Sequence, residues 1–246
     1  MTDTPAIPAA TLVVVRDRHS GPPELLMVER AESMAFAGGA LVFPGGRIDK
    51  EDRALGGSEE GAAKVAAIRE TLEETALAVG INPLPDVPQT RSMQGRLLDD
   101  RPFADVLRDA VAELDLDALI PFARWVPKFH ATRRFDTLFF VARAPDPGRI
   151  PQACGGECTA AFWIGAADAL ERERSGEARL IFPTRRNLER LALHSSFEAI
   201  SEDAQSHSIA PISPWVEEHD GENFITIPDG IGYPVTRERL DGLWRG

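Results

Sequence analysis

The chain has 246 residues, enough for one large domain or two small ones, and its composition of 43% hydrophobic and 27% charged residues is that of an ordinary globular protein. With 39 acidic and 27 basic residues the formal net charge is −12, which argues against nucleic-acid binding and favours a protein that binds cations, or binds anions through a metal ion. No apolar run approaches the roughly 18 residues that cross a bilayer, and residues 1–10 lack the features of a secretory signal. We therefore expect a soluble cytoplasmic protein without a membrane partner.

The first part of the chain predicts three short strands and one long helix. Apolar and β-branched runs, bounded by Gly, Pro and Ser, indicate strands at 11–16, 25–29 and 40–43. The helix is expected from Ser58 to about Val79, because a glycine and two prolines follow it closely.

The segment from about 82 to 119 differs in character, with three prolines before a polar stretch of helical spacing. We interpret it as a helical cap inserted into a single domain that spans residues 1–246. The elements expected after it are strands at 123–126, 137–142, 158–164 and 223–227, and helices at 166–172 and from Thr184, as N-cap, to about Ser201. This mixed order predicts the α+β class, with a mixed β-sheet between helices.

Two stripes of side chains follow the long helix. At 100° per residue its acids, Glu70, Glu73 and Glu74, share the side away from the expected core, and Ala63 keeps that side open. The opposite stripe, which we expect to contact the core, consists of Val65, Ile68, Leu72, Ala76 and Val79.

The three glutamates repel one another, and each like-charged pair at this spacing costs a helix a few tenths of a kcal/mol. A divalent cation would reverse the sign of that interaction, because Mg²⁺ takes oxygen ligands and needs only one or two carboxylates. A solvated acidic helix face would show the same pattern, so the acids alone leave both interpretations open. Gly45 and Gly46, which end a strand and let a ligand approach the backbone closely, favour the metal site.

Gly46 together with the run from Arg69 to Leu77 resembles the box of the Nudix hydrolase family, G-x5-E-x7-R-E-U-x-E-E-x-G-U, in which U is apolar. The gap from Gly46 to Arg69 is nine residues longer than in the pattern, which predicts a longer loop at about 49–58. Three further positions depart from the pattern. Counted back from Arg69, the early glutamate falls on Gly61, next to Glu60; the first U is Thr71; and the last glycine is Ala76, a change expected to be mild inside a helix.

The residues before the box resemble the signature of the coenzyme A diphosphatase branch of that family, L-L-T-x-R-[SA]-x3-R-x3-G-x3-F-P-G-G. Leu26, Arg30, Ala31, Gly39 and Phe43 fall in register with it. The departures are Met27 and Val28 for its second Leu and its Thr, and Ala35 for its second Arg. With the runs 133–137 and 232–234, the similarity to the peroxisomal mammalian type of these enzymes extends from about residue 11 to 234.

The resemblance implies an α/β/α sandwich that hydrolyses a nucleoside diphosphate linked to another moiety, with Mg²⁺ or Mn²⁺ as cofactor. It implies Glu70 and Glu74 as metal ligands, with Glu73 as a further ligand or relay and the carbonyl of Gly46 as an added oxygen. Arg69, four positions before Glu73, is expected to orient that carboxylate.

The general base and the substrate-binding residues are expected from other parts of the chain as well. Glu70, or an acid of a later loop such as Glu157, is a candidate base. Arg30, Arg47 and a basic run before the strand at 137 are candidates for binding phosphate, although an ordinary charged loop would look the same. That run consists of Lys128, His130, Arg133 and Arg134.

Other residues have simpler interpretations. Trp125 and Trp163 are expected in the core or sheet rather than as platforms for a base. Cys154 and Cys158 have no second pair to complete a zinc site, and we interpret them as two reduced thiols in a loop or strand.

Three functions follow from the resemblance. The first is hydrolysis of coenzyme A or acyl-coenzyme A to 3′,5′-ADP and (acyl-)phosphopantetheine. The second changes the substrate to ADP-ribose, a nucleotide sugar or a dinucleotide. The third is a non-catalytic module that senses a nucleotide, from which we would expect some of the acids to be missing. A homodimer is compatible with the sequence, which leaves open whether the insert covers the active site or forms a dimer contact.

Overall fold

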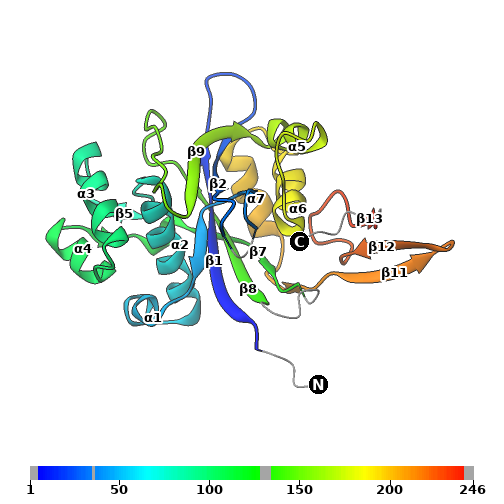
Figure 1. Cartoon of the computed structure of the whole chain (residues 1–246), viewed down its shortest axis with the longest axis horizontal. Coiled ribbons are helices and arrows are strands. Elements are labelled where there is room, and N and C mark those ends of the chain that lie inside the picture. Colours follow the sequence, from blue (N-terminus) through cyan, green and yellow to red (C-terminus); the bar gives the residue numbers. More distant parts are fainter. Residues whose placement is uncertain (1–4, 35–36, 128–133, 241–246) are drawn as a thin grey trace.

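The computed structural model describes residues 5–34, 37–127 and 134–240, and its centre is a mixed β-sheet between two layers of helices (Figure 1). The sheet runs in the order β10-β7-β8-β1-β2-β3, with β4 also paired to β1 and β9 to β2. Its strands are β1 (Ile7–Arg16), β2 (Glu24–Arg30), β3 (Leu41–Val42), β4 (Gly45–Arg47), β7 (Ile120–Trp125), β8 (Phe135–Arg143), β9 (Cys158–Gly165) and β10 (Pro211–Ile212). β1 runs parallel to β8 and antiparallel to β2 and β4. The predicted α+β class with a mixed sheet is confirmed.

Strand β1 is buried on both faces because helices cover both. Its side chains alternate, so that Leu12 and Val14 contact one hydrophobic cluster while Val13 and Val15 contact another. The helices of the first layer are α1 (Lys50–Gly56), α2 (Glu59–Thr75), α3 (Val87–Leu98) and α4 (Phe103–Asp109); those of the second are α5 (Ala166–Arg174), α6 (Phe182–Leu191) and α7 (Phe197–Ser206) (Figure 1).

The sheet divides along one edge of β1. Val15 and Arg16 pair with β2, whereas residues 9–11 pair with β4. Between these two pairings the N–H of Leu12 donates to the carbonyl of Pro44, at 3.0 Å. The chain therefore passes from β3 to β4 through a tight turn at the split, beside helix α2.

The predicted insert is helical and shares the core of the first layer. Met93, Leu97 and Phe103 are buried in the same cluster as Ile68 and Leu72 of α2. The two ends of the insert are joined by the short strands β5 (Ile81–Asn82) and β6 (Glu113–Leu114), followed by a 3-10 turn at Leu116–Ala118. The division of the chain into a single domain at 1–246 stays a prediction.

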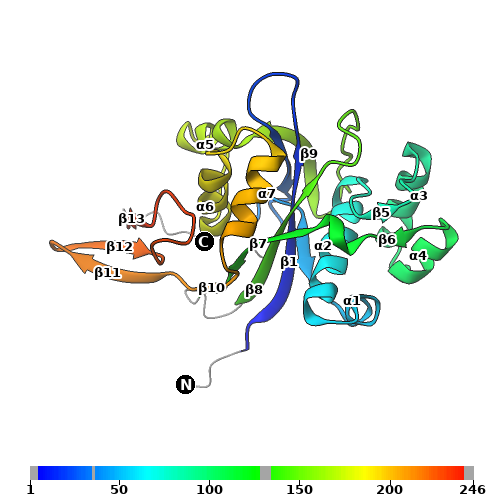
Figure 2. The same ribbon diagram turned by 180° about the vertical axis from the view of Figure 1, so that it is seen from behind.

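One prediction for the second half of the chain is wrong. The single helix expected at 184–201 is two helices: Thr184 is buried in the first turn of α6, and Ser196 caps α7 by accepting from the N–H of Ala199, at 3.2 Å. The strand expected at 223–227 is confirmed, and it pairs with two strands that were not expected. A second sheet, which extends away from the main sheet in Figures 1 and 2, consists of β11 (Trp215–His219), β12 (Glu222–Thr226) and β13 (Arg237–Arg239).

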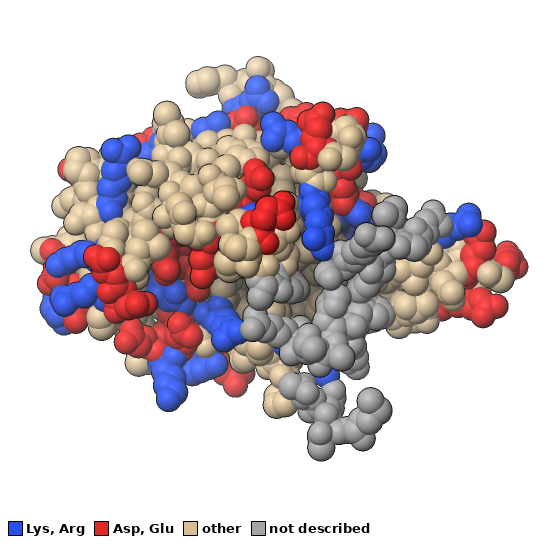
Figure 3. All heavy atoms as spheres, in the orientation of Figure 1, with Lys and Arg blue, Asp and Glu red and all other residues tan. Residues whose placement is uncertain are grey.

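Charged side chains of both signs are interspersed on the face drawn in Figure 3. The basic residues visible there lie among acidic ones, which does not favour a phosphate backbone as partner. In the described part of the chain, no helix is both long and apolar enough to cross a membrane.

Candidate active site

Helix α2 carries the three glutamates and is defined at both ends. As predicted, it begins after Ser58, whose Oγ accepts from the N–H of Gly61 at 2.9 Å. The predicted end at Val79 is wrong, because the helix stops at Thr75 and Ala76 adopts a left-handed conformation, with φ of 54°. Ala76 is thus not a mild change inside the helix. It is the C-cap, a position where glycine is the favoured residue.

The acidic side of α2 faces the protein, contrary to the prediction that it lies away from the core. Glu74 is only 3% exposed, and Ala63, expected to keep this side open, is fully buried. Helix α1 packs closely against the first turn of α2, because a Cβ added at Gly61 would lie 2.0 Å from the carbonyl oxygen of Gly56. The helical periodicity predicted which residues share one side of α2, but it did not predict what that side contacts.

The extra residues in the box form helix α1 rather than the predicted longer loop, and they supply a buried acid that the sequence analysis missed. Asp52 is fully buried and accepts two hydrogen bonds from Arg69, both at 3.0 Å. Counted forward from Gly46, Asp52 occupies the place of the early glutamate of the box. Counting back from Arg69 placed that acid at Gly61, and the neighbouring Glu60 pairs instead with Lys64, at 3.1 Å.

Arg69 connects four acids rather than orienting Glu73 alone. Its Nη1 donates to Glu70 Oε1 at 3.0 Å and lies 3.5 Å from Glu73 Oε2, while Nη2 lies 3.7 Å from Asp49 Oδ2. Burial by itself would lower the pKa of Arg69, but the hydrogen bonds to Asp52 and the nearby carboxylates raise it. Arg69 therefore stays charged, and its charge holds the carboxylates together.

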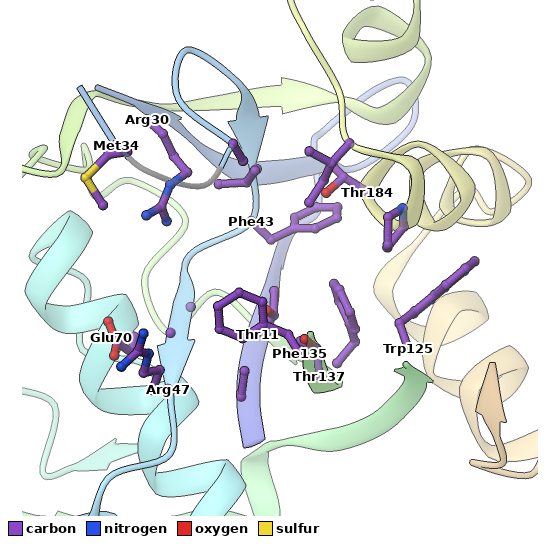
Figure 4. A pocket seen from close by; sticks show the side chains of 18 of the residues that line it. Thr11, Arg30, Met34, Phe43, Arg47, Glu70, Trp125, Phe135, Thr137 and Thr184 are labelled. Atoms are coloured by element: carbon purple, nitrogen blue, oxygen red, sulfur yellow. The ribbon is translucent and has the colours of Figure 1, made fainter. Parts of the chain in front are cut away.

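The two glycines of the turn leave room for neighbouring groups. A Cβ at Gly46 would lie 2.2 Å from Glu70 Oε1, and a Cβ at Gly45 would lie 2.4 Å from the carbonyl oxygen of Ala10. Because residue 46 is glycine, the Glu70 carboxylate can lie directly against the backbone at this position. In Figure 4 the side chains of Glu70 and Arg47 lie next to each other beside this strand.

Glu70 and Glu74 are carboxylates with raised pKa values. Burial raises the pKa of Glu70 to about 7, despite the opposing charge of Arg69. Burial, followed by the charge of Glu70, raises the pKa of Glu74 well above its usual range. The opposing contacts are a hydrogen bond from the N–H of Gly45, at 3.1 Å, and the guanidinium of Arg30, at 4.0 Å.

This donor set suits a hard divalent cation. The groups are carboxylate and backbone oxygens, and burial leaves the charges of Glu70 and Glu74 incompletely compensated, which a bound cation would correct. Within the described ranges, no three His, Cys, Asp or Glu side chains form a ready set of metal ligands. Mg²⁺ fits such a partial set, since it normally keeps several waters or substrate oxygens.

A cavity of about 1240 Å³ opens beside the carboxylates. Arg30, Arg47, Glu70 and Glu73 line one part of it. The Nε of Arg30 is buried and has no hydrogen-bond partner among the described residues, as expected for a cation that faces an anionic ligand. The other part is aromatic (Figure 4), and its lining includes Phe43, Trp125, Phe135, Phe139 and Phe182.

The remaining predicted residues have different locations. Glu157 borders the cavity with its side chain 66% exposed, and its Oε2 lies 4.0 Å from Arg30 Nη2. Arg134 lies just before β8, and its carbonyl accepts a hydrogen bond from the N–H of Ile7 at 2.7 Å. Arg134 is not among the described residues that line the cavity. The predicted positions Lys128, His130 and Arg133 lie outside the described residues. From the insert, the cavity wall receives Leu97, Asp100, Arg101 and Phe103.

The tryptophans and cysteines agree with their predictions. Trp125 is fully buried and its indole N–H donates to Tyr233 Oη at 3.2 Å, although the ring also borders the cavity. Trp163 is half-buried in strand β9, with the guanidinium of Arg16 over its ring. Cys154, in a loop, and Cys158, at the start of β9, are free thiols.

Comparisons with known proteins bear on the family of this chain. Residues 6–183 match the model of the NUDIX domain. A Caenorhabditis elegans protein described as "Putative nudix hydrolase 7" is 26% identical over 205 residues, which are 82% of this chain. The match covers 66% of that protein, so this chain spans just under two thirds of the relative's length. The crystal structure of a NUDIX hydrolase from Alicyclobacillus acidocaldarius is 30% identical, with a TM-score of 0.72 over 85% of this chain and 99% of the other.

Proposed function

Since the chain belongs to the Nudix hydrolase family of pyrophosphohydrolases, we propose that it cleaves a nucleoside diphosphate linked to a second moiety, with Mg²⁺ or Mn²⁺ as cofactor. One observation carries the proposal. Buried carboxylates of α2 lie against a glycine strand, at the wall of a cavity that Arg30 also lines, and among the described residues the buried Nε of Arg30 has no hydrogen-bond partner. An acidic protein can bind a diphosphate there because a metal ion and arginines offset the repulsion.

Glu70 and Glu74 would hold the metal, with the carbonyl of Gly46 and the Glu73 carboxylate as further oxygen donors. When bound, the metal neutralises the diphosphate and acidifies the attacking water. Arg69 positions Glu70 and Glu73, and Asp52 in turn fixes Arg69. We assign proton acceptance to Glu70, which lines the cavity beside the proposed metal site, with Glu157 as the alternative to be tested.

Coenzyme A or acyl-coenzyme A is the substrate that we propose. Arg30, which matches the arginine of the coenzyme A signature, lines the cavity 4.0 Å from Glu74. The aromatic part of the cavity offers stacking or apolar contact to an adenine ring or an acyl chain. Ala35, which lies outside the described residues, replaces the second arginine of the signature. Because that arginine is missing, ADP-ribose, nucleotide sugars and dinucleotides are the competing substrates.

The experiment offers coenzyme A, acetyl-coenzyme A, ADP-ribose and ADP-glucose to the purified protein with Mg²⁺, and follows the products by chromatography. We expect 3′,5′-ADP from the coenzyme A compounds, and no turnover by Glu74→Gln. Cleavage of ADP-ribose alone would reject the coenzyme A assignment. If no diphosphate is cleaved and Glu74→Gln binds nucleotide as the wild type does, the chain is a binding module instead.

Arg30→Gln tests how the substrate is held. We expect KM for the anionic substrate to rise at least tenfold, which corresponds to about 1.4 kcal/mol of binding. Arg96→Gln is the matched control, because Arg96 lies in α3, pairs with Asp109 and is not among the described residues lining the cavity. An unchanged KM in Arg30→Gln would remove Arg30 from the substrate site.

A further inference from the structure

The turn that connects Cys154 to Cys158 brings the only two cysteines of the chain together. The N–H of Gly155 donates to the carbonyl of Cys158 at 3.2 Å, and Gly155 has a φ of 78°. Added Cβ atoms at Gly155 and Gly156 would meet nothing within 4 Å, so these glycines serve the reversal of the chain rather than close packing. Both cysteines pack in the same small apolar cluster.

The two thiols have unequal environments. Cys158 is fully buried, whereas Cys154 is partly exposed. A hydrogen bond from the thiol of Cys158, supported by backbone N–H groups of the turn, lowers the pKa of Cys154 to about 5. The same hydrogen bond, together with burial, raises the pKa of Cys158. Cys154 is thus the accessible thiol, in an environment that favours its thiolate, and Cys158 is the enclosed thiol.

We propose that Cys154 and Cys158 are a redox site, which a hydroperoxide converts to an intramolecular disulfide, and that this bond lowers turnover at the neighbouring carboxylate site. The juxtaposition of one accessible and one buried thiol across a five-residue turn carries the proposal. The effect on turnover rests on the proposed function, whereas disulfide formation does not.

The chemistry is a two-electron oxidation of two thiols. The Cys154 thiolate attacks one oxygen of the hydroperoxide, the O–O bond breaks, and the leaving alkoxide takes up a proton to become an alcohol. The resulting sulfenic acid is attacked by the sulfur of Cys158. An S–S bond forms, and the hydroxyl group leaves as water with the proton of the Cys158 thiol.

Glu157 connects this turn to the carboxylate site. Its carbonyl accepts from the N–H of Ala31 at 2.8 Å, and its carboxylate lies 4.0 Å from Arg30. Cys158 pairs with Arg30 across the sheet, at an irregularity in the register of β2 and β9. Arg30 in turn faces Glu74. A disulfide has a restricted geometry, so its closure would shift Glu157 and displace Arg30 from the substrate phosphate.

Mass spectrometry tests the disulfide directly. After treatment with hydrogen peroxide, we expect the intact monomer to lose the mass of two hydrogen atoms and a reductant to restore it. In Cys158→Ser, Cys154 should be trapped as a sulfenic acid by dimedone, whereas Cys154→Ser should resist trapping in the native protein. Absence of the mass loss, disulfide-linked dimers in place of the monomer, or equal trapping in both variants would overturn the proposal.

Hydrolysis tests the coupling. Oxidised wild-type protein should lose turnover several-fold and recover it with the reductant, whereas the double variant Cys154→Ser/Cys158→Ser should be unaffected by peroxide. Full turnover of the oxidised wild type would refute the coupling. If the reduced protein cleaves no diphosphate, the proposed function fails, while the mass measurement still decides whether the redox site exists.

Discussion

Replacing Asp52 by Asn changes the buried acid that holds Arg69 and leaves the size of the side chain almost unchanged. Asp52 accepts two hydrogen bonds from Arg69 and a third from its own helix cap, the N–H of Asp49, at 2.8 Å. Asparagine has one accepting oxygen, and its amide would point N–H groups at the guanidinium. At least one charge-assisted bond is therefore lost, together with the charge that compensates Arg69 in a buried site.

Hydrogen bonds to charged groups contribute about 1.5–3 kcal/mol each, and breaking a buried ion pair costs about 3–5 kcal/mol. Glu70 and Glu73 still face Arg69 in the variant, so we expect the lower end, a loss of about 3 kcal/mol. For a chain of this size each kcal/mol corresponds to roughly 2–4 °C, which predicts a Tm lower by roughly 10 °C. Turnover should fall as well, because Arg69 would no longer position Glu70.

The assay is chemical denaturation together with thermal unfolding, and Asp49→Asn is the matched control. Asp49 is 66% exposed and lies 3.7 Å from Arg69, and Asn is as good an N-cap as Asp. The control should change the unfolding free energy by less than about 1 kcal/mol. Equal losses in both variants, or an unchanged stability of Asp52→Asn, would refute the view that burial makes Asp52 the anchor of Arg69.

Three further variants test other features. Burial, only partly opposed by Arg186, raises the pKa of Glu189 to about 7, so ionisation of Glu189 destabilises the folded state as the pH rises from about 4.5 to 7. Glu189→Gln should therefore raise Tm at pH 8 and have no such effect below pH 4.5. The reverse pH dependence of Tm would contradict this explanation. Ala76→Gly should stabilise the protein by about 0.5 kcal/mol in denaturation, since relief of about 1–2 kcal/mol of left-handed strain exceeds the entropy cost of glycine, and a lower stability would contradict this. Gly46→Ala should abolish Mg²⁺-dependent turnover while far-UV circular dichroism stays native, because the new Cβ displaces the Glu70 carboxylate. Retained turnover would show that the close approach of Glu70 to residue 46 is not needed.

Local patterns predicted most of the elements near the active site. The apolar run at 11–16 lies within β1, and the start of α2 at Ser58 follows from an N-cap side chain that bonds within one turn. These features depend on neighbours in the sequence, which is why they could be read from it. The same holds for the approach of Arg69 to Glu73, one turn later on the helix.

The wrong predictions concern elements whose ends or pairing depend on residues distant in the chain. The left-handed cap at Ala76 ends α2 four residues early, and the gap between α6 and α7 breaks a segment that has helical spacing throughout. Strands β11 and β13 were missed because their pairing with β12 supplies what their short and polar sequences do not.

The sequence by itself determined the family box, the identity of the three glutamates and the glycine turn before them, because these are matters of residue type and spacing. Only the tertiary structure decided that the acids face inward, that Asp52 is the acid paired with Arg69, and that the insert forms part of the cavity wall. The physical reason is burial. Whether a carboxylate is solvated or enclosed, and which cation compensates it, depends on how α1, α2 and the split sheet pack against one another, and no local pattern encodes that packing.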